Sequence, residues 1–138
     1  MVLFHINENI FTSNCDYLVN PVNCVGVMGK GLALQFKEKF PYMFIDYKDK
    51  CIRKEVKPGV PYIYKNIINF PTKDDWRNLS QMSWIIKGLN WIKDNLHNVS
   101  IAIPPVGCGL GGLNQDEVFK YMYDIFNESD IQLNIYVK

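Results

Sequence analysis

The chain alternates between short apolar runs and longer stretches in which apolar positions recur every three or four residues. Short runs rich in β-branched and aromatic residues are typical of strands, and the longer spacing is typical of amphipathic helices. We therefore predict strands at residues 2–6, 17–20, 60–64, 67–70, 99–103 and 133–137. Helices are predicted at 31–40, at 42–53, from just after Asn78 to about 97 with an apolar face that starts at Met82, and around an apolar stripe at 118–126.

Local signals mark the predicted helix ends. Pro41 is expected to end the helix at 31–40, because proline lacks the N–H that a helix interior needs. Asn78 with Gln81, and Asn114 with Glu117, have the spacing of a capping box, in which the first side chain accepts a bond from the backbone three residues on. The third and fourth helices are expected to begin after these asparagines.

Strands that alternate with helices along the chain indicate a layered α/β fold around one sheet. Two glycine-rich segments, VNPVNCVGVMGKGLALQFKEKFP at 19–41 and PPVGCGLGGL at 104–113, each follow or overlap the end of a predicted strand. Ligands of open α/β sheets bind outside the carboxyl ends of the strands. We therefore expect both segments to line one ligand cleft at that edge.

Composition limits the classes of function. The 138 residues suit one domain with a substantial core, and 48% hydrophobic with 21% charged residues is ordinary for a globular protein. A net charge of +1 argues against a general polyanion binder. No apolar run approaches the ~20 residues of a membrane-spanning helix, and residues 1–9 lack the pattern of a signal peptide.

The cysteines do not predict a metal site. Cys15, Cys24, Cys51 and Cys108 form no CxxC pair, and the chain has only two histidines, so no zinc is expected. Free thiols without an export signal favour the reducing cytoplasm. Cys24 and Cys108 lie beside glycines, but no histidine is near either in sequence, and we interpret both as small buried residues rather than nucleophiles.

The glycine segments favour a ligand that contains phosphate. Gly26, Gly29 and Gly31 permit backbone angles that let N–H groups approach a phosphate, and Lys30 adds positive charge. Four more glycines fall within 107–112, a density that would destabilise an ordinary connection through backbone entropy. The Walker A spacing is absent. A tight turn without ligand for the first segment and a mobile surface loop for the second remain open as alternatives.

Two residue pairs have more than one interpretation. Asn20 and Asn23 carry amides that both donate and accept, which suits sugar hydroxyls, but asparagine is also common in turns. Trp76 and Arg77 combine an aromatic ring with a cation. In one interpretation, the Trp76 ring stacks on a base and Arg77 contacts a phosphate. In the other, Trp76 packs as a lid on the core and Arg77 is exposed.

Together, these segments resemble the two ligand loops of macrodomains, the ADP-ribose-binding modules. VNPVNCVGVMGKGLALQFKEKFP and IPPVGCGLGGL are specific as a pair. IINFPTKDDWRNLS is similar to a segment of the branch that includes terminal ADP-ribose protein glycohydrolase and the DarG antitoxins. The resemblance covers nearly the whole chain. It implies a single macrodomain over residues 1–138, with three α/β/α layers and a mixed central sheet.

The resemblance also implies which residues bind ADP-ribose. Asn9 stands where the family has an aspartate that holds the adenine, and its oxygen can still accept from the adenine amino group. Asn20 and Asn23 match asparagines near the distal ribose, 29–31 match the loop around the distal ribose and diphosphate, and 106–111 match the diphosphate loop. The full implied set is Asn9, Ile10, Asn20, Asn23, Val27, Met28, Gly29, Lys30, Gly31, Val106, Gly107, Cys108, Gly109, Leu110 and Gly111.

Lys73 is the residue that the resemblance implies to be catalytic, with Asn20 orienting the distal ribose. A lysine amine held near the anomeric carbon can act as a nucleophile or as a polar orienting group. Without the resemblance, a solvated loop lysine is the plainer interpretation. The protein glycohydrolase of this branch has an acidic residue where this chain has Gly111, whereas DarG-type proteins have glycine. Asp74 and Asp75 are an alternative source of a carboxylate.

We therefore expect an antitoxin-like ADP-ribosyl hydrolase that removes ADP-ribose from modified targets, with thymidine bases of DNA favoured as in the DarG-type branch. The implied partners are ADP-ribose, ADP-ribosylated DNA or protein, and a cognate ADP-ribosyltransferase toxin, with no cofactor and no membrane. Two alternatives stay open. The chain is a reader that binds ADP-ribose without cleaving it, or it acts on ADP-ribosylated protein carboxylates or on ADP-ribose 1″-phosphate.

Overall fold

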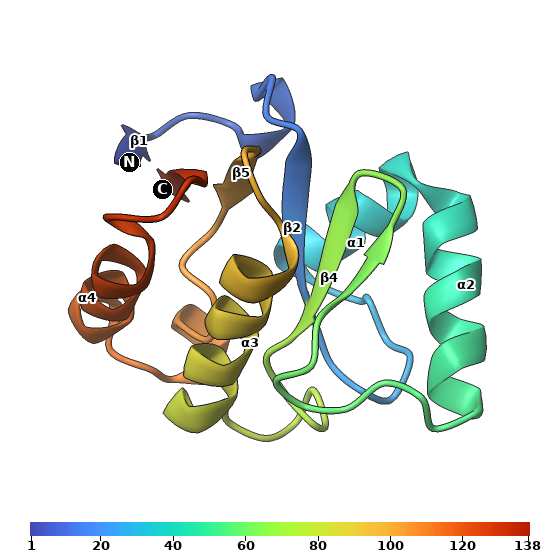
Figure 1. Cartoon of the computed structure of the whole chain (residues 1–138). Coiled ribbons are helices and arrows are strands. Elements are labelled where there is room, and N and C mark those ends of the chain that lie inside the picture. Colours follow the sequence, from blue (N-terminus) through green and yellow to red (C-terminus); the bar gives the residue numbers. More distant parts are fainter.

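The computed structural model describes residues 1–138 and contains one six-stranded sheet with four α-helices. The strands lie in the order β1-β6-β5-β2-β4-β3 (Figure 1). They are β1 (Val2–Ile6), β2 (Tyr17–Val22), β3 (Tyr62–Tyr64), β4 (Ile67–Pro71), β5 (Ser100–Ile103) and β6 (Gln132–Val137). The helices are α1 (Gly31–Lys39), α2 (Pro41–Ile52), α3 (Met82–Asn95) and α4 (Gln115–Phe126).

All ten predicted strands and helices are present, and only their ends differ from the prediction. β2 continues to Val22, into the first glycine segment. β3 is shorter than predicted because Pro61, directly before it, has no N–H to donate to a neighbouring strand. Pro41 ends α1 as predicted and also begins α2, since its fixed φ and missing N–H suit the first position of a helix.

The two predicted helix caps have different outcomes. Asn114 caps α4 as predicted, and its side-chain oxygen accepts a hydrogen bond from the Glu117 backbone N–H at 3.0 Å. The prediction for Asn78 is wrong, because the N-cap of α3 is Gln81, which makes no side-chain capping bond. Asn78 instead closes a turn in which its N–H donates to the Asp75 carbonyl oxygen at 3.0 Å. The chain before α3 is therefore a loop.

Five strands run parallel and one runs against them. β1, β6, β5, β2 and β4 pair in parallel, and β3 pairs antiparallel with β4, which confirms the mixed sheet. The carboxyl ends of the five parallel strands consequently meet at one edge of the sheet. Because β5, β2 and β4 are consecutive neighbours, the loops that follow them lie side by side.

Helices cover both faces of the sheet, with α3 in front of the central strands and α1 behind them (Figure 1). Neighbouring strand residues face opposite layers. In β2, Val19 packs in the cluster that contains residues of α3 and α4, and Leu18 packs in the cluster that contains residues of α1 and α2. In β5, Ile101 and Ala102 divide in the same way. The predicted three-layer α/β/α architecture is thus confirmed.

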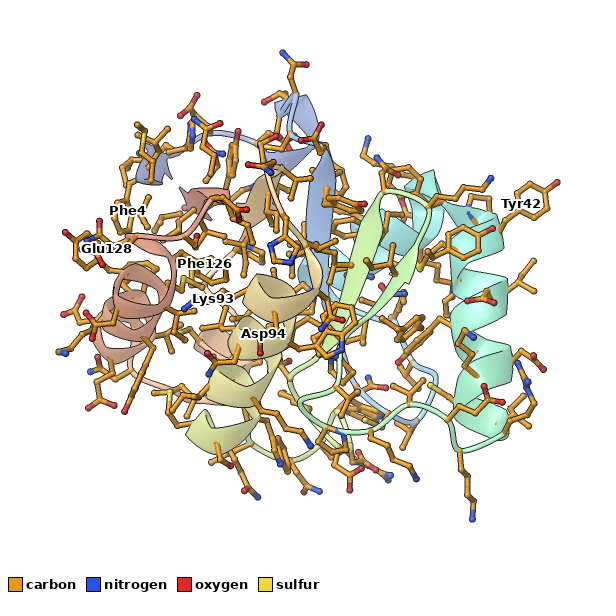
Figure 2. The ribbon with its side chains drawn as sticks, viewed as in Figure 1. Phe4, Tyr42, Lys93, Asp94, Phe126 and Glu128 are labelled. Atoms are coloured by element: carbon orange, nitrogen blue, oxygen red, sulfur yellow. The ribbon has the colours of Figure 1, made fainter.

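The apolar stripe predicted for the last helix faces the sheet. Phe126, at the end of α4, is fully buried in the core, whereas Tyr42 at the start of α2 projects outward and is 75% exposed (Figure 2). Phe4 on the edge strand β1 packs edge-on against Phe119 of α4, with 5.2 Å between ring centroids. The contacts of α4 therefore extend to the edge of the sheet.

The backbone of α3 approaches β4 closely at Gly88. A Cβ on Gly88 would overlap the Phe70 ring, and both residues are buried. Only glycine lets the aromatic ring lie against the helix at this distance. The position of α3, which follows the loop that contains Lys73, therefore depends on this contact.

We expect Gly88→Ala to lower the free energy of unfolding by about 1–3 kcal/mol, because the added methyl forces the ring or the helix to move. Helix propensity alone would favour alanine by ~1 kcal/mol, so the sign of the change separates the two effects. Urea unfolding followed by circular dichroism measures the change. Ser83→Ala, on the exposed side of the same helix, is the matched control. An unchanged or increased free energy for Gly88→Ala would contradict this packing.

Candidate functional site

The loops after β2, β4 and β5 enclose a cleft of about 760 Å³. Its lining comes from within residues 21–33, 72–80 and 105–111. This volume lies in the range of roughly 300–1,000 Å³ that is typical of small-molecule sites. The prediction that both glycine segments face one cleft is confirmed, and the loop that contains Lys73 forms its third wall.

A second cavity of about 410 Å³ adjoins the first. The two cavities share Gly31, Leu32, Pro105 and Cys108 in their linings. The rest of its lining comes from the loop after β1, the end of β6, the second glycine segment, and Gln35 and Gln115 at the neighbouring helices. Together the cavities follow the carboxyl edge of the sheet and provide an elongated site for an extended ligand.

Most residues of the implied ligand set line these cavities. The cleft is lined by Asn23, Val27, Gly29, Lys30, Gly31, Lys73, Gly107, Cys108, Leu110 and Gly111. The second cavity is lined by Asn9, Ile10, Gly31, Cys108 and Gly109. Asn20, Met28 and Val106 line neither cavity and are at most 1% exposed. These three residues are part of the core beneath the loops.

Asn23 holds the first glycine segment in shape. Its Nδ2 donates to the Val27 carbonyl oxygen at 2.8 Å, and its Oδ1 accepts from the Val25 N–H at 3.0 Å. The Tyr47 hydroxyl, from α2, lies 2.7 Å from the same Oδ1 and 2.8 Å from the Asn23 carbonyl oxygen. Burial raises the pKa of Tyr47, which keeps this phenol a donor. The amide is thus used inside the protein, and its contact with a ribose stays a prediction.

Asn20 lies inside β2, opposite Asn69 of β4. Its Nδ2 donates to Asn69 Oδ1 at 3.0 Å, and Asn69 Nδ2 donates to the Tyr62 hydroxyl at 3.1 Å. The role of Asn20 in orienting the ribose stays a prediction, and the residue itself is fully buried and lines neither cavity. The reason is its register: a residue inside a central strand faces the packed layers rather than the open edge.

Lys73 lies in the third wall of the cleft, two residues beyond β4. Its Nζ donates to the Trp76 carbonyl oxygen at 3.3 Å. Its own carbonyl oxygen accepts from the Cys24 thiol at 3.4 Å, and the Cys24 N–H donates to the Asp74 carbonyl oxygen at 3.0 Å. The backbone at Lys73 and Asp74 is therefore bonded to Cys24 of the first glycine segment, and the amine is held at the wall of the cleft by the Trp76 carbonyl oxygen.

The second glycine segment needs glycine for two different reasons. Gly107 has a φ of +78°, and a Cβ there would lie 2.7 Å from a methyl of Leu113. Gly111 has an ordinary φ, but a Cβ there would lie 2.6 Å from Ser80 Oγ and 3.9 Å from Lys73 Cε. The segment is thus packed, and the interpretation of a mobile surface loop is not supported.

The thiols beside the glycines are poor nucleophiles. Burial, together with the negative charge of Asp74, raises the pKa of Cys24 to about 12. Burial also raises the pKa of Cys108. Both cysteines are partly exposed rather than fully buried. Because a thiol attacks as a thiolate, these shifts support the interpretation that neither cysteine is a nucleophile.

Trp76 forms an exposed rim of the cleft. Its side chain is 48% exposed, which excludes the interpretation of a lid packed on the core. The Arg77 guanidinium lies over its ring, 5.3 Å from the centroid, and pairs with Asp75 through contacts of 3.0 and 2.8 Å. Hydrogen bonds from Arg77 lower the pKa of Asp75 to about 2. The Asp75 carboxylate is therefore engaged by Arg77 and not by Lys73.

Asn9 lies in the second cavity, at the start of a short 3-10 helix (Ile10–Thr12). Its side-chain oxygen accepts a hydrogen bond from the Phe11 N–H at 2.9 Å. An amide oxygen has two lone pairs, so one acceptor site stays open towards a ligand. The structure thus allows the adenine contact implied for this residue, which stays a prediction.

Sequence reasoning missed several residues that line the site. Ser80 and Thr72 line the cleft, and Gln35, Gln115 and Tyr136 line the second cavity. Tyr136 could be found only with the strand order, because β6 lies between β1 and β5 and ends at the same edge. For Ser80, no sequence signal distinguishes it from an ordinary loop serine.

The model of the Macro domain family matches residues 19–122, which is more than half of the chain. The chain therefore belongs to the macro domain family. This match spans both glycine segments and the loop that contains Lys73. It agrees with the six-stranded mixed sheet and with the joined cavities at its carboxyl edge.

Among sequence relatives, the chain is similar to the DNA ADP-ribosyl glycohydrolase of Mycobacterium tuberculosis. The two are 40% identical over 141 residues, covering 93% of this chain and 40% of that protein. A DNA ADP-ribosyl transferase-DNA ADP-ribosyl glycohydrolase fusion protein of Thermosipho africanus is 34% identical over 158 residues, covering 96% of this chain and 41% of that protein. The chain spans about two fifths of the length of these curated relatives.

Solved structures that are similar to this chain include macrodomains of DarG-type proteins. The macrodomain of Mycobacterium tuberculosis DarG has a TM-score of 0.90 and 39% identity, with 99% of this chain and 97% of that one covered. Thermosipho africanus DarTG in complex with ADP-ribose has a TM-score of 0.89 and 34% identity, with 99% and 42% covered. The resemblance to DarG-type macrodomains, predicted from the loop sequences, is thus confirmed.

None of the helices combines the length and the apolar character that crossing a membrane would require.

We expect Tyr47→Phe to lower the free energy of unfolding by about 1–3 kcal/mol, because it removes the one hydroxyl proton that the carbonyl oxygen and Oδ1 of Asn23 share. The ring itself keeps its packing, so the loss reports on the hydrogen bonds. Thermal and urea unfolding measure it. Tyr42→Phe, at an exposed position of the same helix, is the control. Equal stability of the Tyr47→Phe variant and the unchanged protein would show that this hydroxyl does not hold the loop.

Proposed function

We propose that this chain binds ADP-ribose in the joined cavities and hydrolyses the bond between ADP-ribose and a DNA base. The observation that carries the proposal is the position of Lys73 in the wall of the cleft, beside Gly111 and between the two glycine segments. The similarity to macrodomains of DarG and to proteins named DNA ADP-ribosyl glycohydrolase supports the same activity.

The ligand would lie along the carboxyl edge of the sheet. Its adenine end occupies the second cavity beside Asn9 and Ile10, and its diphosphate crosses the segments at Gly29–Gly31 and 107–111. Backbone N–H groups of such turns bind phosphate oxygens. The distal ribose then falls at the Lys73 end of the cleft. The complex of Thermosipho africanus DarTG with ADP-ribose supports this ligand.

The reaction needs one group that acts at the anomeric carbon of the distal ribose. The glycosidic bond to the base breaks, the oxygen of a water molecule ends on the anomeric carbon, and a proton from that water ends on the base. The Lys73 amine acts at this carbon, either as a transient nucleophile or by orienting the sugar and the water. The products are free ADP-ribose and an unmodified base.

The rim of the cleft favours a nucleic-acid target over a protein carboxylate. Trp76 exposes an aromatic face at the Lys73 end, and Leu79 and Leu110 are exposed beside it at 68% and 73%. A base attached to the distal ribose would leave the cleft at this rim, where an aromatic ring can stack on it. Arg77 supplies a cation next to the ring for the phosphate backbone.

The biological setting in this proposal is that of an antitoxin. A relative that carries a transferase and a glycohydrolase in one chain supports a cognate ADP-ribosyltransferase as the partner whose modification is reversed. Four free cysteines support the reducing cytoplasm as the compartment. A single macrodomain over residues 1–138 is the unit proposed to carry the activity.

A reader of ADP-ribose is the alternative function that the geometry also accommodates. The glycine segments and the second cavity suffice for binding, and the Lys73 amine is hydrogen-bonded to the Trp76 carbonyl oxygen. Tight binding of ADP-ribose without release from DNA, from protein carboxylates or from ADP-ribose 1″-phosphate would establish the reader. Product analysis on these three substrates separates the possible hydrolytic activities.

We expect Lys73→Ala to reduce release of ADP-ribose from ADP-ribosylated thymidine DNA by roughly 100-fold or more, because the group that acts at the anomeric carbon is removed. Affinity for free ADP-ribose should change little, since the glycine segments remain. Turnover and calorimetry on the same preparations measure both quantities. Lys93→Ala, on the exposed side of α3 (Figure 2), is the control. Undiminished turnover by the Lys73→Ala variant would refute the assigned mechanism.

We expect Trp76→Ala to lower kcat/KM for ADP-ribosylated DNA roughly fivefold or more, because a base–aromatic stack is lost. Trp76→Phe should keep most of the activity, and affinity for free ADP-ribose should be unchanged in both variants. Turnover on an ADP-ribosylated protein serves as a second substrate. An equal loss on DNA and protein substrates would mean that Trp76 shapes the cleft rather than recognises the base.

A further inference from the structure

Two buried side-chain oxygens have no hydrogen-bond partner within the protein, Asn20 Oδ1 and Ser80 Oγ. Only Ser80 belongs to the lining of the cleft, although it is just 7% exposed. Burial of a hydroxyl that loses its hydrogen bonds to water and gains none from the protein lowers the free energy of unfolding. An alanine at the same position would avoid this loss. The Ser80 oxygen itself is covered, and rotation about the Cα–Cβ bond is what would turn it from this unpaired position towards a ligand in the cleft.

Ser80 is fixed to the second glycine segment at Gly111. Its N–H donates to the Gly111 carbonyl oxygen at 2.9 Å. A Cβ on Gly111 would lie 2.6 Å from Ser80 Oγ and 3.9 Å from Lys73 Cε, and a Cβ on Gly112 would lie 3.0 Å from Leu79. The Ser80 hydroxyl thus occupies the space that a side chain at position 111 would need. The end of the Lys73 side chain borders the same space.

We propose that Ser80 is a positioning residue of this site, whose hydroxyl hydrogen-bonds to the distal ribose and holds the anomeric carbon beside Lys73. A serine hydroxyl both donates and accepts, which matches a sugar hydroxyl. In this structure, Gly111 leaves no side chain to make that contact from the second segment. The inference rests on the ADP-ribose ligand proposed above, and it does not depend on hydrolysis.

The position of Ser80 in the cleft indicates which part of the ligand it contacts. Ser80 lines the cleft but not the second cavity, where the adenine end is proposed to lie. Asn20 is buried beneath the loops, so Ser80 is the nearer of the two unpaired side chains to the space of the cleft. Ser80 then provides a neutral hydrogen-bonding group next to the amine at this end.

The test compares ADP-ribose with ADP, which lacks the distal ribose, by calorimetry on Ser80→Ala. We expect the Kd for ADP-ribose to rise about fivefold to tenfold, and the Kd for ADP to change by less than about twofold, as for one lost neutral hydrogen bond. The melting temperature should stay the same or rise, because the unpaired hydroxyl is gone. Ser83→Ala, an exposed serine on α3, is the matched control and should change nothing.

An unchanged Kd for ADP-ribose, or an equal rise for ADP, would overturn the inference, since a general distortion of the cleft affects both ligands. Ser80→Cys keeps the side-chain size with a much weaker donor and should give the same selective loss, so the test does not depend on one variant folding. Wild-type protein that binds no ADP-ribose would refute both this inference and the proposed function. Binding without release from DNA would refute hydrolysis alone.

Discussion

The parallel pairing of β2 with β5 on one side and β4 on the other is the constraint on which the site depends. Parallel neighbours begin and end at the same edges, so three loops that are distant in the sequence emerge side by side. The two glycine segments and the loop of Lys73 are thereby brought around one cleft. A different strand order would leave the same loop sequences in separate places.

Backbone hydrogen bonds then fix these loops to one another. The Thr72 N–H donates to the Val22 carbonyl oxygen at 2.9 Å, and the Cys24 N–H donates to the Asp74 carbonyl oxygen at 3.0 Å. On the other side, Ser80 is bonded to Gly111 of the second segment. A ligand that enters the cleft therefore meets walls that are already ordered, and less of its binding free energy is lost to ordering them.

Around the cleft, several polar side chains are buried and several apolar side chains are exposed, which is the reverse of the usual distribution. The buried Asn20 and Asn69 form a hydrogen-bonded row with the partly buried Tyr62 beneath the loops, while Trp76 and Leu110 are exposed at the rim. Buried amides are tolerated because most of their groups are paired with each other. The exposed apolar side chains suit a partner that covers them. This division is consistent with a polar ligand inside the cleft and a stacked base at its rim.

The sequence by itself determined the strands, the helices, the α/β class and the two glycine segments, because periodicity and turn chemistry are local properties. It also indicated the family, since the loop motifs are contiguous stretches. Only the tertiary structure decided that Asn20 lies in the core, that Trp76 is exposed and that Ser80 lies against Gly111 with an unpaired hydroxyl. Burial and contacts between loops depend on strand order and register, which join residues far apart in the chain, and spacing along the sequence does not encode them.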